Sequence, residues 1–406
     1  MSPNRTSVRA LAAVSFLLLS PARSQQATRG GTPEVAAVAD QRQAVAFAGA
    51  QLERLCVLAG SGYPDHTVNG KWRLRGPSNW TAGYFAGMLW LMYGHTKDPA
   101  WLERARKWTE PIGAFRHEER DLNLGLSFMP TFVAGHRLTG DATYRRIALD
   151  AADSLAARFM PGGYIRSWGT VGDPKQQEII IIDCLIDLDL LYWAARQSGN
   201  GTFSDIATSH ARITVDTAIR PDGSSVQVVE LDPRTGRKVA DRHKQGISPR
   251  SCWSRGQAFG IYALADIHRF TGEAKFLDAA EVLSGYWLKN IPEDYVPYWD
   301  FDAPRTAAEP RDSSAAAMAA GGFWKLSKLL KDKAQAGRYR EAATRTLNAL
   351  TQRYLASGPA VDEGRILVHA TLHKPAGLGI DESMILGDYY YLELLLNVIN
   401  DAAGGG

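Results

Sequence analysis

Two kinds of helical segment alternate along the chain, and this alternation limits what it can fold into. In residues 141–159 the apolar side chains recur on one face, as in a helix that packs on one side only. Similar segments span about 40–58, 98–114, 203–219, 273–290 and 336–356. Between them lie segments that are apolar nearly all round, at about 80–94, 123–138, 180–198, 253–270, 311–330 and 382–400. A helix that is apolar on every side must be buried on every side.

Six buried helices alternating with six one-sided helices predict an all-α fold, an (α/α)6 barrel with an inner and an outer ring. The inner segments open with small or polar residues, so we expect their N-terminal ends to meet at one rim and form a cleft. The stretch 224–239 predicts a β-hairpin on this rim. Because no linker-like segment interrupts the pattern, we expect a single catalytic domain over residues 37–401.

The first 24 residues have the pattern of an export signal. Arg5 and Arg9 precede a short apolar core, residues 10–19, and small residues close the segment. This core is shorter than the ~20 apolar residues that span a bilayer. We therefore expect residues 1–24 to be cleaved and the mature protein to be secreted or periplasmic, without membrane attachment. The two loose ends are a flexible N-terminal segment, residues 25–36, and a disordered tail, residues 402–406.

Charge and cysteine content exclude several classes of protein. Arg5, Arg9 and Arg23 account for the whole formal charge of +3, so the rest of the chain is formally neutral and nucleic acid is not an expected partner. Three cysteines are too few for a disulfide framework, and no Cys/His cluster has the spacing of a zinc site. No phosphate-binding Gly-rich loop is present. The sequence predicts no metal and no cofactor, and it leaves the oligomeric state open.

Asp183 is the strongest single candidate for chemistry. It follows four consecutive isoleucines and precedes an apolar Cys-Leu-Ile, so its carboxyl group should be poorly solvated. Poor solvation raises the pKa of a carboxyl group and lets it donate a proton near neutral pH. The structural alternative is that Asp183 caps the third inner helix. Cys184 is expected to be a buried free thiol, and Asp187 and Asp189 to be partnered structural carboxylates.

Aromatic side chains gather near the starts of the inner helices. Sugar rings stack on such faces, and ordinary core packing is the competing explanation for each residue. The group consists of Trp80, Trp168, Trp253, Phe259, Tyr298 and Trp299. The motif Trp253-Ser-Arg255-Gly-Gln places a guanidinium group beside an indole, which suits binding of a carboxylate or of hydroxyl groups. His369 and His373 have helical spacing, but without the glutamate of a His-Glu-x-x-His motif they do not indicate a metal.

Six ordered segments carry a resemblance to a known family. They are Asn79-Trp-Thr-Ala-Gly-Tyr-Phe-Ala-Gly-Met-Leu-Trp, Leu124-Gly with Arg137-Leu-Thr-Gly-Asp, Ile182-Asp-Cys-Leu with Leu190-Leu-Tyr-Trp, Trp253-Ser-Arg-Gly-Gln-Ala-Phe-Gly, Arg311-Asp-Ser-Ser-Ala, and Asp381-Glu-Ser with Gly387-Asp-Tyr-Tyr-Tyr-Leu-Glu. Over most of its mature length the chain resembles the unsaturated glucuronyl hydrolases of glycoside hydrolase family 88. The resemblance implies an (α/α)6 barrel that uses no metal.

The resemblance also implies a reaction that begins with hydration rather than attack on the anomeric carbon. Lyases leave a C4=C5 double bond on the terminal uronic acid of an oligosaccharide, which would be the substrate. An aspartic acid, matched here by Asp183, protonates C4, and its carboxylate then helps water to add at C5. The hemiketal opens and the glycosidic bond is lost. Positions that line the sugar site in the family are matched by Trp80, Trp168, Gln245, Arg255 and His369.

Three positions depart from the family pattern. Asn123 stands where an aspartate, usually within His-Asp-Leu/Ile-Gly-Phe, is the second key carboxylate; it can still bind a sugar hydroxyl but brings no charge to raise the pKa of Asp183. Gln227 replaces the histidine of Asp-Gly-Ser-x-x-His, and Phe259 replaces a tryptophan. Besides an unsaturated-uronide hydrolase, two alternatives stay open. One is a related barrel glycosidase with a shifted substrate, such as an unsaturated rhamnogalacturonan-type disaccharide or another uronide. The other is an inactive sugar-binding paralogue.

Basic residues near the fifth inner helix offer further contacts to an acidic sugar. Lys374, Arg305 and Arg311 can each hold a sulfate or carboxylate, and solvated surface charge is the competing explanation. The candidate catalytic residues are therefore Asp183 and Asn123. The candidate substrate-binding residues are Trp80, Trp168, Gln227, Gln245, Trp253, Arg255, Phe259, His369 and Lys374.

Overall fold

The structure, a computed structural model, describes residues 33–118, 123–169, 173 and 179–404. The predicted export signal, residues 1–24, lies outside the described residues. So do residues 25–32 of the predicted flexible segment and residues 405–406 of the predicted tail. Among the described residues, no helix is long and apolar enough to cross a membrane.

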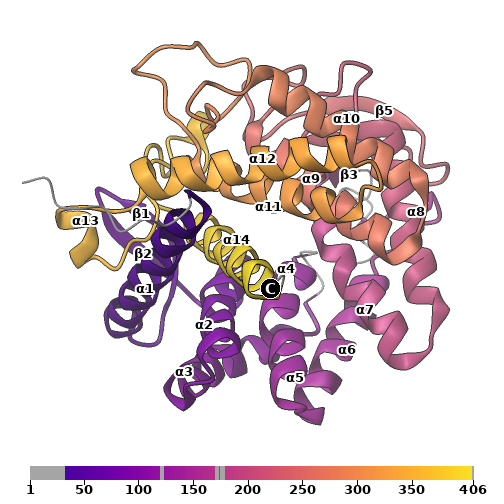
Figure 1. The fold of residues 1–406 in the computed structure, drawn as a ribbon. Helices are drawn as coiled ribbons and strands as arrows, with labels where there is room; N and C mark the ends of the chain where they lie inside the picture. Colours follow the sequence, from indigo (N-terminus) through magenta and orange to yellow (C-terminus); the bar gives the residue numbers. More distant parts are fainter. Residues whose placement is uncertain (1–32, 119–122, 170–172, 174–178, 405–406) are drawn as a thin grey trace, which may run out of the picture.

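Within the described residues, the predicted inner segments form a closed ring. They are α2 (Ala82–Thr96), α4 (Leu124–Phe128) continued by η2 (Met129–Val133) and α5 (Ala134–Thr139), η4 (Ile182–Asp187) continued by α7 (Leu188–Ser198), α9 (Ser254–Thr271), α11 (Ser313–Leu329) and α14 (Ile385–Gly404). Each contacts the next, and α14 returns to contact α2. The chain follows this ring in sequence order (Figure 1). The prediction of an (α/α)6 barrel is confirmed.

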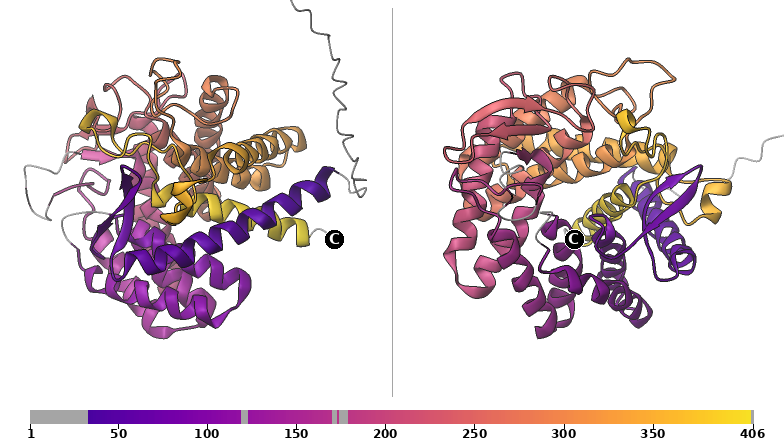
Figure 2. Two further views of the ribbon diagram at one scale, coloured as in Figure 1. Left: turned by 90° about the vertical axis from the view of Figure 1, so that its left-hand side faces the viewer. Right: turned by 180° about the vertical axis from the view of Figure 1, so that it is seen from behind.

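Each inner segment is covered by an outer helix. The outer helices are α1 (Pro33–Ala59), α3 (Pro99–Thr109), α6 (Ala142–Ala156), α8 (Gly201–Ala218), α10 (Ala274–Asn290) and α12 (Lys333–Ala349). They contact α14, α2, α4, α7, α9 and α11 respectively. Figure 2 shows the first and last helices, indigo and yellow, lying side by side, which joins the two ends of the chain.

Burial explains which helices lie inside. Every residue of α9 from Ser254 to Ile267 is buried, whereas α12 buries one stripe that includes Tyr339, Ala343 and Leu347. This is the difference between all-round and one-sided apolar patterns in the sequence. The remaining short helical turns are η1 (Glu110–Phe115), η5 (Leu350–Tyr354), α13 (Pro359–Asp362) and η6 (Lys374–Ala376).

Helix ends differ from expectation at both termini. Helix α1 begins at Pro33, inside the predicted flexible segment 25–36, and proline is well suited to a first turn because its missing N–H has no helical partner there. Helix α14 runs to Gly404, inside the predicted tail 402–406. The amphipathic pattern therefore underestimates the length of both helices.

The third inner segment is not one continuous helix, contrary to the prediction for 180–198. Residues Ile179–Ile181 form strand β3, and the α-helix starts only at Leu188. The isoleucine run favours a strand because β-branched side chains pack well on a pleated surface. Strand β4 (Val228–Leu231) supplies the partner, with Ile180 opposite Val229.

The predicted hairpin at 224–239 is confirmed and is part of a three-stranded antiparallel sheet. Its strands are β4 and β5 (Lys238–Arg242), and the strand order is β3-β4-β5. A second hairpin, β1 (Tyr63–Val68) with β2 (Lys71–Arg75), was not predicted. Its signal was present in the sequence: Asn69 and Gly70 both take positive φ, 51° and 76°, in the Asn-Gly turn that favours two-residue hairpins.

Candidate active site

A pocket of about 320 Å³ lies where several inner segments begin. Trp80, Asn123 and Trp253 come directly before α2, α4 and α9 or within two residues of them, and Asp183 lies in the first turn of η4. This fits the expectation that the N-terminal ends of the inner segments meet at one rim. The predicted site residues that line the pocket are Trp80, Asn123, Trp168, Asp183, Gln245, Trp253, Arg255 and Phe259.

The main chain is fixed on both sides of Asp183. Before it, Ile181 pairs with Val228 in the sheet, and the Ile182 N–H donates to the Gln227 carbonyl at 3.1 Å. The Ile181 N–H also donates to the Ser167 hydroxyl at 3.0 Å. Strand β3 therefore ends two residues before Asp183, which lies in the tight turn that follows and lines the pocket.

The Asp183 carboxyl group is desolvated, and no cation forms an ion pair with it among the described residues. Its Oδ1 is inaccessible to solvent and accepts no hydrogen bond within the described residues. Burial raises the pKa of Asp183 to about 7, while the positive charges of Arg255 and Lys244 oppose that rise. The capping alternative is wrong, because Ile181 is the N-cap of η4 and no side chain caps this turn. Asp183 can therefore hold a proton near neutral pH and deliver it into the pocket.

Asn123 is brought to the same pocket by a close contact between two inner segments. Gly125 approaches Asp187 so closely that a Cβ there would lie 2.2 Å from the Asp187 Cα. The Asp187 Oδ1 accepts the Leu126 N–H at 2.9 Å, which confirms a structural role for Asp187. Asn123 is the N-cap residue of α4, but its side chain makes no capping hydrogen bond. Asn123 lines the pocket.

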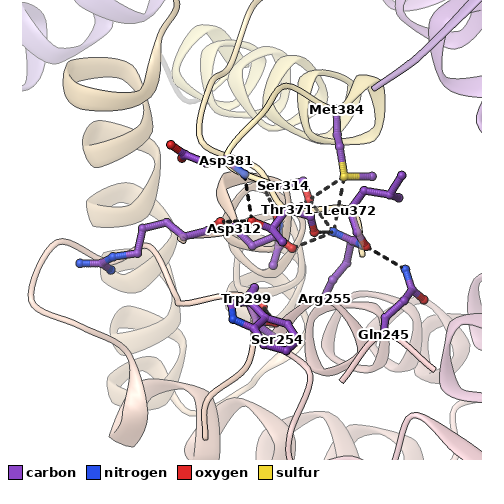
Figure 3. A network of polar contacts seen from close by, with 12 residues as sticks. Gln245, Ser254, Arg255, Trp299, Asp312, Ser314, Thr371, Leu372, Asp381 and Met384 are labelled. Carbon is purple, nitrogen blue, oxygen red and sulfur yellow. Dashed lines mark hydrogen bonds and ion pairs between the residues drawn. The ribbon is translucent and has the colours of Figure 1, made fainter. Parts of the chain in front are cut away.

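Arg255 is more deeply buried, and makes more contacts within the protein, than the Trp253-Ser-Arg255 motif suggested. Its side chain is fully buried and pairs with Asp312 at 2.7 Å, with both side chains 0% exposed. It also donates to the carbonyls of Thr371 at 2.8 Å and Leu372 at 2.6 Å (Figure 3). Most of its donors are therefore used by the protein. Arg255 ties the segment around residue 372 to the barrel and lies 4.7 Å from the Trp253 ring centroid.

Gln227 lies behind the pocket wall rather than in it. It is 7% exposed, and its Oε1 accepts the N–H groups of Lys244 at 2.9 Å and Gln245 at 2.7 Å. Its Nε2 donates to the Gln245 Oε1 at 2.8 Å, and Gln245 in turn donates to the Leu372 carbonyl at 3.1 Å. The predicted direct contact between Gln227 and the sugar does not match this placement, because the amide is consumed in holding the loop after β5.

Two other predicted residues also lie away from this pocket. His369 lines a separate pocket of about 480 Å³, where its Nδ1 lies 2.7 Å from the Asp381 carboxylate. Lys374 pairs with Glu309 and lies 5.2 Å from the Trp299 ring centroid. His369 and His373 do not share a helical face, because the chain between them is not helical and His369 itself has a φ of 64°. Among the described residues, no group of three His, Cys, Asp or Glu side chains is placed to hold a metal ion.

Comparisons with known proteins agree on one family. The model of Glycosyl Hydrolase Family 88 matches residues 60–397. An unsaturated glucuronyl hydrolase of Bacillus sp. (strain GL1) is 36% identical over 355 residues, covering 85% of this chain and 93% of that protein. An unsaturated chondroitin disaccharide hydrolase of Streptococcus pneumoniae is 34% identical over 330 residues, covering 80% and 83%. The chain belongs to glycosyl hydrolase family 88.

Solved structures of the family share this fold. The unsaturated glucuronyl hydrolase of Bacillus sp. GL1 superposes with a TM-score of 0.85 at 32% identity, over 88% of this chain and 96% of that chain. A structure of an unsaturated glucuronyl hydrolase specific for heparin gives 0.84 at 29% identity, over 91% and 98%. As a member of family 88, the chain is a glycosidase.

The family 88 pocket has two polar residues that were not among the predicted contacts. Lys244 and His373 both line it. Burial, then the charges of Lys244 and Arg255, lower the pKa of His373, which favours its neutral form. Lys244 lies next to Gln245 in the sequence, at the end of the charged run Arg242-His243-Lys244. The sequence signal for Lys244 was its position next to Gln245, which matches a sugar-site position of the family. The structure adds that Lys244 follows strand β5 and lines the pocket.

The aromatic walls of the pocket divide into two classes. Trp253 and Phe259 are 3% and 1% exposed, so they are chiefly core residues that form the floor. Trp80 and Trp168 are only partly buried, so each leaves ring surface open toward the pocket. Partly open indole faces are suited to stacking with the apolar face of a sugar ring.

Proposed function

We propose that this family 88 glycosidase releases a terminal 4,5-unsaturated uronic acid from oligosaccharides produced by polysaccharide lyases, with Asp183 as acid and base. The observation that carries the proposal is the desolvated Asp183 carboxyl group, whose Oδ1 accepts no hydrogen bond among the described residues, in an aromatic-walled pocket of a family 88 barrel. The names of the relatives support the substrate class. So does a related structure, from Streptococcus agalactiae, described as complexed with dGlcA-GalNAc6S.

The chemistry needs one group that is protonated at rest. Asp183 donates its proton to C4 of the C4=C5 bond, and positive charge develops at C5 beside the ring oxygen. Water adds at C5 and gives a proton to the Asp183 carboxylate, which restores the acid. The resulting hemiketal opens and the aglycone leaves. A pKa near 7 suits both halves of this cycle, because the group must give up and regain a proton at similar cost.

Asn123 has a neutral role in this scheme. Its amide can donate to one sugar hydroxyl and accept from another, which orients the ring over Asp183. It adds no negative charge, and the raised pKa of Asp183 has burial as its largest cause. The acid therefore does not depend on a second carboxylate to remain protonated near neutral pH.

The test is the loss of the double bond. Purified protein is incubated with unsaturated disaccharides from chondroitin, heparin, ulvan and pectin lyase digests, and absorbance is followed at about 235 nm, because protonation of C4 consumes the absorbing bond. Loss of absorbance with wild type, and none with Asp183→Asn, is the expected result. Wild-type protein that consumes none of these bonds contradicts the proposal.

A second candidate function rests on Asn123. Because the family position carries a neutral amide here, the second candidate is a family 88 glycosidase with a shifted substrate, such as an unsaturated rhamnogalacturonan-type disaccharide. The same absorbance assay separates the two candidates. Turnover of the rhamnogalacturonan-type disaccharide alone supports the shifted substrate, and turnover of the chondroitin or heparin disaccharides excludes it.

We further propose that the protein is exported after cleavage of residues 1–24, on the strength of the basic start and short apolar core. Mass spectrometry of the protein recovered from the periplasm or the medium of a producing cell tests this. A mature chain that begins near residue 25 is expected. Intact residues 1–24 on cytoplasmic protein only would contradict it.

A further inference from the structure

Lys244 is a positive charge on the wall of the Asp183 pocket that has no assigned function. Its Nζ lies 4.4 Å from the Trp168 ring centroid. In the part of the chain that the structure describes, no carboxylate pairs with it, whereas Lys238 and Arg242 on the same hairpin pair with Asp241 and Glu230. The two neighbouring cations are thus neutralised, whereas Lys244 lies beside the pocket with no carboxylate partner in the described ranges.

Among the described residues that line the pocket, the other charged side chains are neutralised by a partner or by their protonation state. Arg255 is neutralised by Asp312. The lowered pKa of His373 keeps that ring neutral near pH 7. Asp183 must be protonated to act, and Asn123 carries no charge. Lys244 therefore gives the working pocket a net positive charge, which complements a ligand that brings an anionic group.

The main chain at Lys244 is held by its surroundings, and the exposed side chain lies against an indole. The Lys244 N–H donates to Gln227 at 2.9 Å, and the neighbouring Gln245 side chain reaches the Leu372 carbonyl at 3.1 Å. The indole of Trp168 attracts the ammonium group through its electron-rich face. A cation that is held before the ligand arrives loses less side-chain entropy on binding.

We propose that Lys244 is a specificity-determining residue that binds an anionic group of the substrate, a carboxylate or a sulfate. This inference rests on the proposed function and deepens it, because it states which feature of an unsaturated oligosaccharide this pocket selects. The carboxylate would come from the unsaturated uronate itself, and a sulfate from the adjoining sugar. Either would replace water around the ammonium with a charge-assisted hydrogen bond.

The experiment crosses a change in the protein with a change in the substrate. Lys244→Met is compared with wild type and with Lys238→Met, a matched lysine on the same hairpin outside the pocket. The substrates are an unsulfated unsaturated chondroitin disaccharide, its 6-sulfated form and the methyl ester of the unsulfated form. If the uronate carboxylate is the ligand, Lys244→Met raises KM for the unsulfated acid about tenfold or more and abolishes the preference for acid over ester.

If a sulfate is the ligand, only the 6-sulfated substrate loses affinity in Lys244→Met. Lys244→Arg should restore the lost affinity to within about threefold, because the charge is kept. Unchanged KM values for Lys244→Met on all three substrates would overturn the inference. Should wild type turn over none of them, calorimetric binding of the disaccharides to wild type and Lys244→Met decides instead: about tenfold weaker binding supports the inference and equal binding refutes it.

A pH profile separates binding from mere support of the loop. The groups whose charges act on Asp183 or are affected by it come from several elements: Arg255 from α9, Lys244 after β5, Tyr84 from α2, and Cys184 and Asp187 from η4. Since the Lys244 charge lowers the pKa of Asp183, its loss should move the alkaline fall of kcat/KM to higher pH. Lys238→Met should leave the profile unchanged, and an identical profile for Lys244→Met would contradict the placement of its charge at the pocket.

Discussion

Asp183 and Asp189 lie six residues apart, and each has a buried Oδ1 without a hydrogen-bond partner among the described residues. They line different cavities. Asp183 lines the pocket of about 320 Å³ between aromatic side chains, and Asp189 lines a larger cavity of about 410 Å³. Burial raises the pKa of both carboxyl groups. Solvation alone therefore does not distinguish the two residues.

The surroundings of the two carboxyl groups differ in charge. The cavity at Asp189 is also lined by Asp266 and Glu393 and by Lys325 and Arg269, and Asp266 pairs with both of these cations. This mixture of acids and bases resembles an internal salt-bridge network. The pocket at Asp183 has one acid, a partly exposed indole on each of Trp80 and Trp168, and a lysine without a carboxylate partner in the described chain.

The comparison shows that a raised pKa identifies an acid that can keep its proton, not an acid that has a substrate. Asp183 has both a proton to give and an uncrowded apolar surface for a sugar ring. Asp189 also has a raised pKa, but its cavity, although partly apolar, contains the charged side chains of Asp266, Glu393, Lys325 and Arg269. We therefore place the chemistry in the smaller cavity.

The largest expected effect contrasts the same substitution at the two residues. Asp183→Asn should lower kcat by about a thousandfold or more, because general acid catalysis contributes roughly 10²–10⁴-fold and the carboxylate is also needed to accept the water proton. Asp189→Asn should leave kcat within about twofold of wild type. Absorbance assays on the best lyase product measure both. Equal losses in the two variants would remove the distinction between the cavities.

The Asp183→Asn substitution, which should lower kcat, should not lower the stability of the fold. A carboxyl group whose pKa is raised by folding destabilises the protein once the pH exceeds its unfolded pKa near 4, and the penalty is complete above about pH 7. Asp183→Asn should therefore melt at the wild-type temperature or slightly above it at pH 8. A melting temperature lower by more than about 5 °C would assign Asp183 a structural role instead.

The second prediction tests the network beside Asp189. Asp266→Ala leaves Lys325 and Arg269 without their shared partner, and we expect the free energy of unfolding to fall by about 2–3 kcal/mol, reduced from a fully buried pair because both cations are partly exposed. Chemical denaturation measures the loss. Asp278→Ala, an exposed acid on α10, is the control and should cost less than ~0.5 kcal/mol. Equal stability of the two variants would show that the network contributes nothing.

The third prediction is the alkaline limit of activity. Because the protonated form of Asp183 is the active acid, kcat/KM should be flat below about pH 7 and fall about tenfold for each further pH unit. The Asp189→Asn variant should retain this limit. A limit below pH 5 would indicate an acid with an ordinary carboxyl pKa and would point away from Asp183.

Much of this could be predicted from the sequence, because the relevant signals are local. The all-round and one-sided helices follow from periodicity, and the solvation of Asp183 follows from the isoleucines beside it. The second hairpin could also have been predicted from the Asn69-Gly70 turn sequence. Its strand Lys71–Arg75 alternates charged residues with Trp72 and Leu74, a period-two pattern that also indicates a strand.

The positions that sequence reasoning misplaced depend on contacts between distant segments. The Gln227 side chain accepts hydrogen bonds from the N–H groups of Lys244 and Gln245, about 17 residues further along the chain. No local sequence pattern reveals such bonds. Arg255 has its partners more than 50 residues away at Asp312 and Thr371. His369 and His373 were predicted to share one face of a helix, but the chain between them is not helical and the two side chains line different pockets.

The smallest expected effect concerns Asn123, which lines the same pocket as Asp183. Asn123→Asp would place a second negative charge in the Asp183 pocket and make that pocket more like the acid-rich cavity at Asp189. The added charge should raise the pKa of Asp183 further, by about one unit or less, and move the alkaline fall of kcat/KM upward by the same amount. Parallel pH profiles of wild type and Asn123→Asp, with Asn123→Ser as the uncharged control, measure the shift. A variant with an unmoved profile but altered KM would mean that Asn123 contacts the sugar without sensing the charge of Asp183, and its amide would then be a determinant of substrate choice alone.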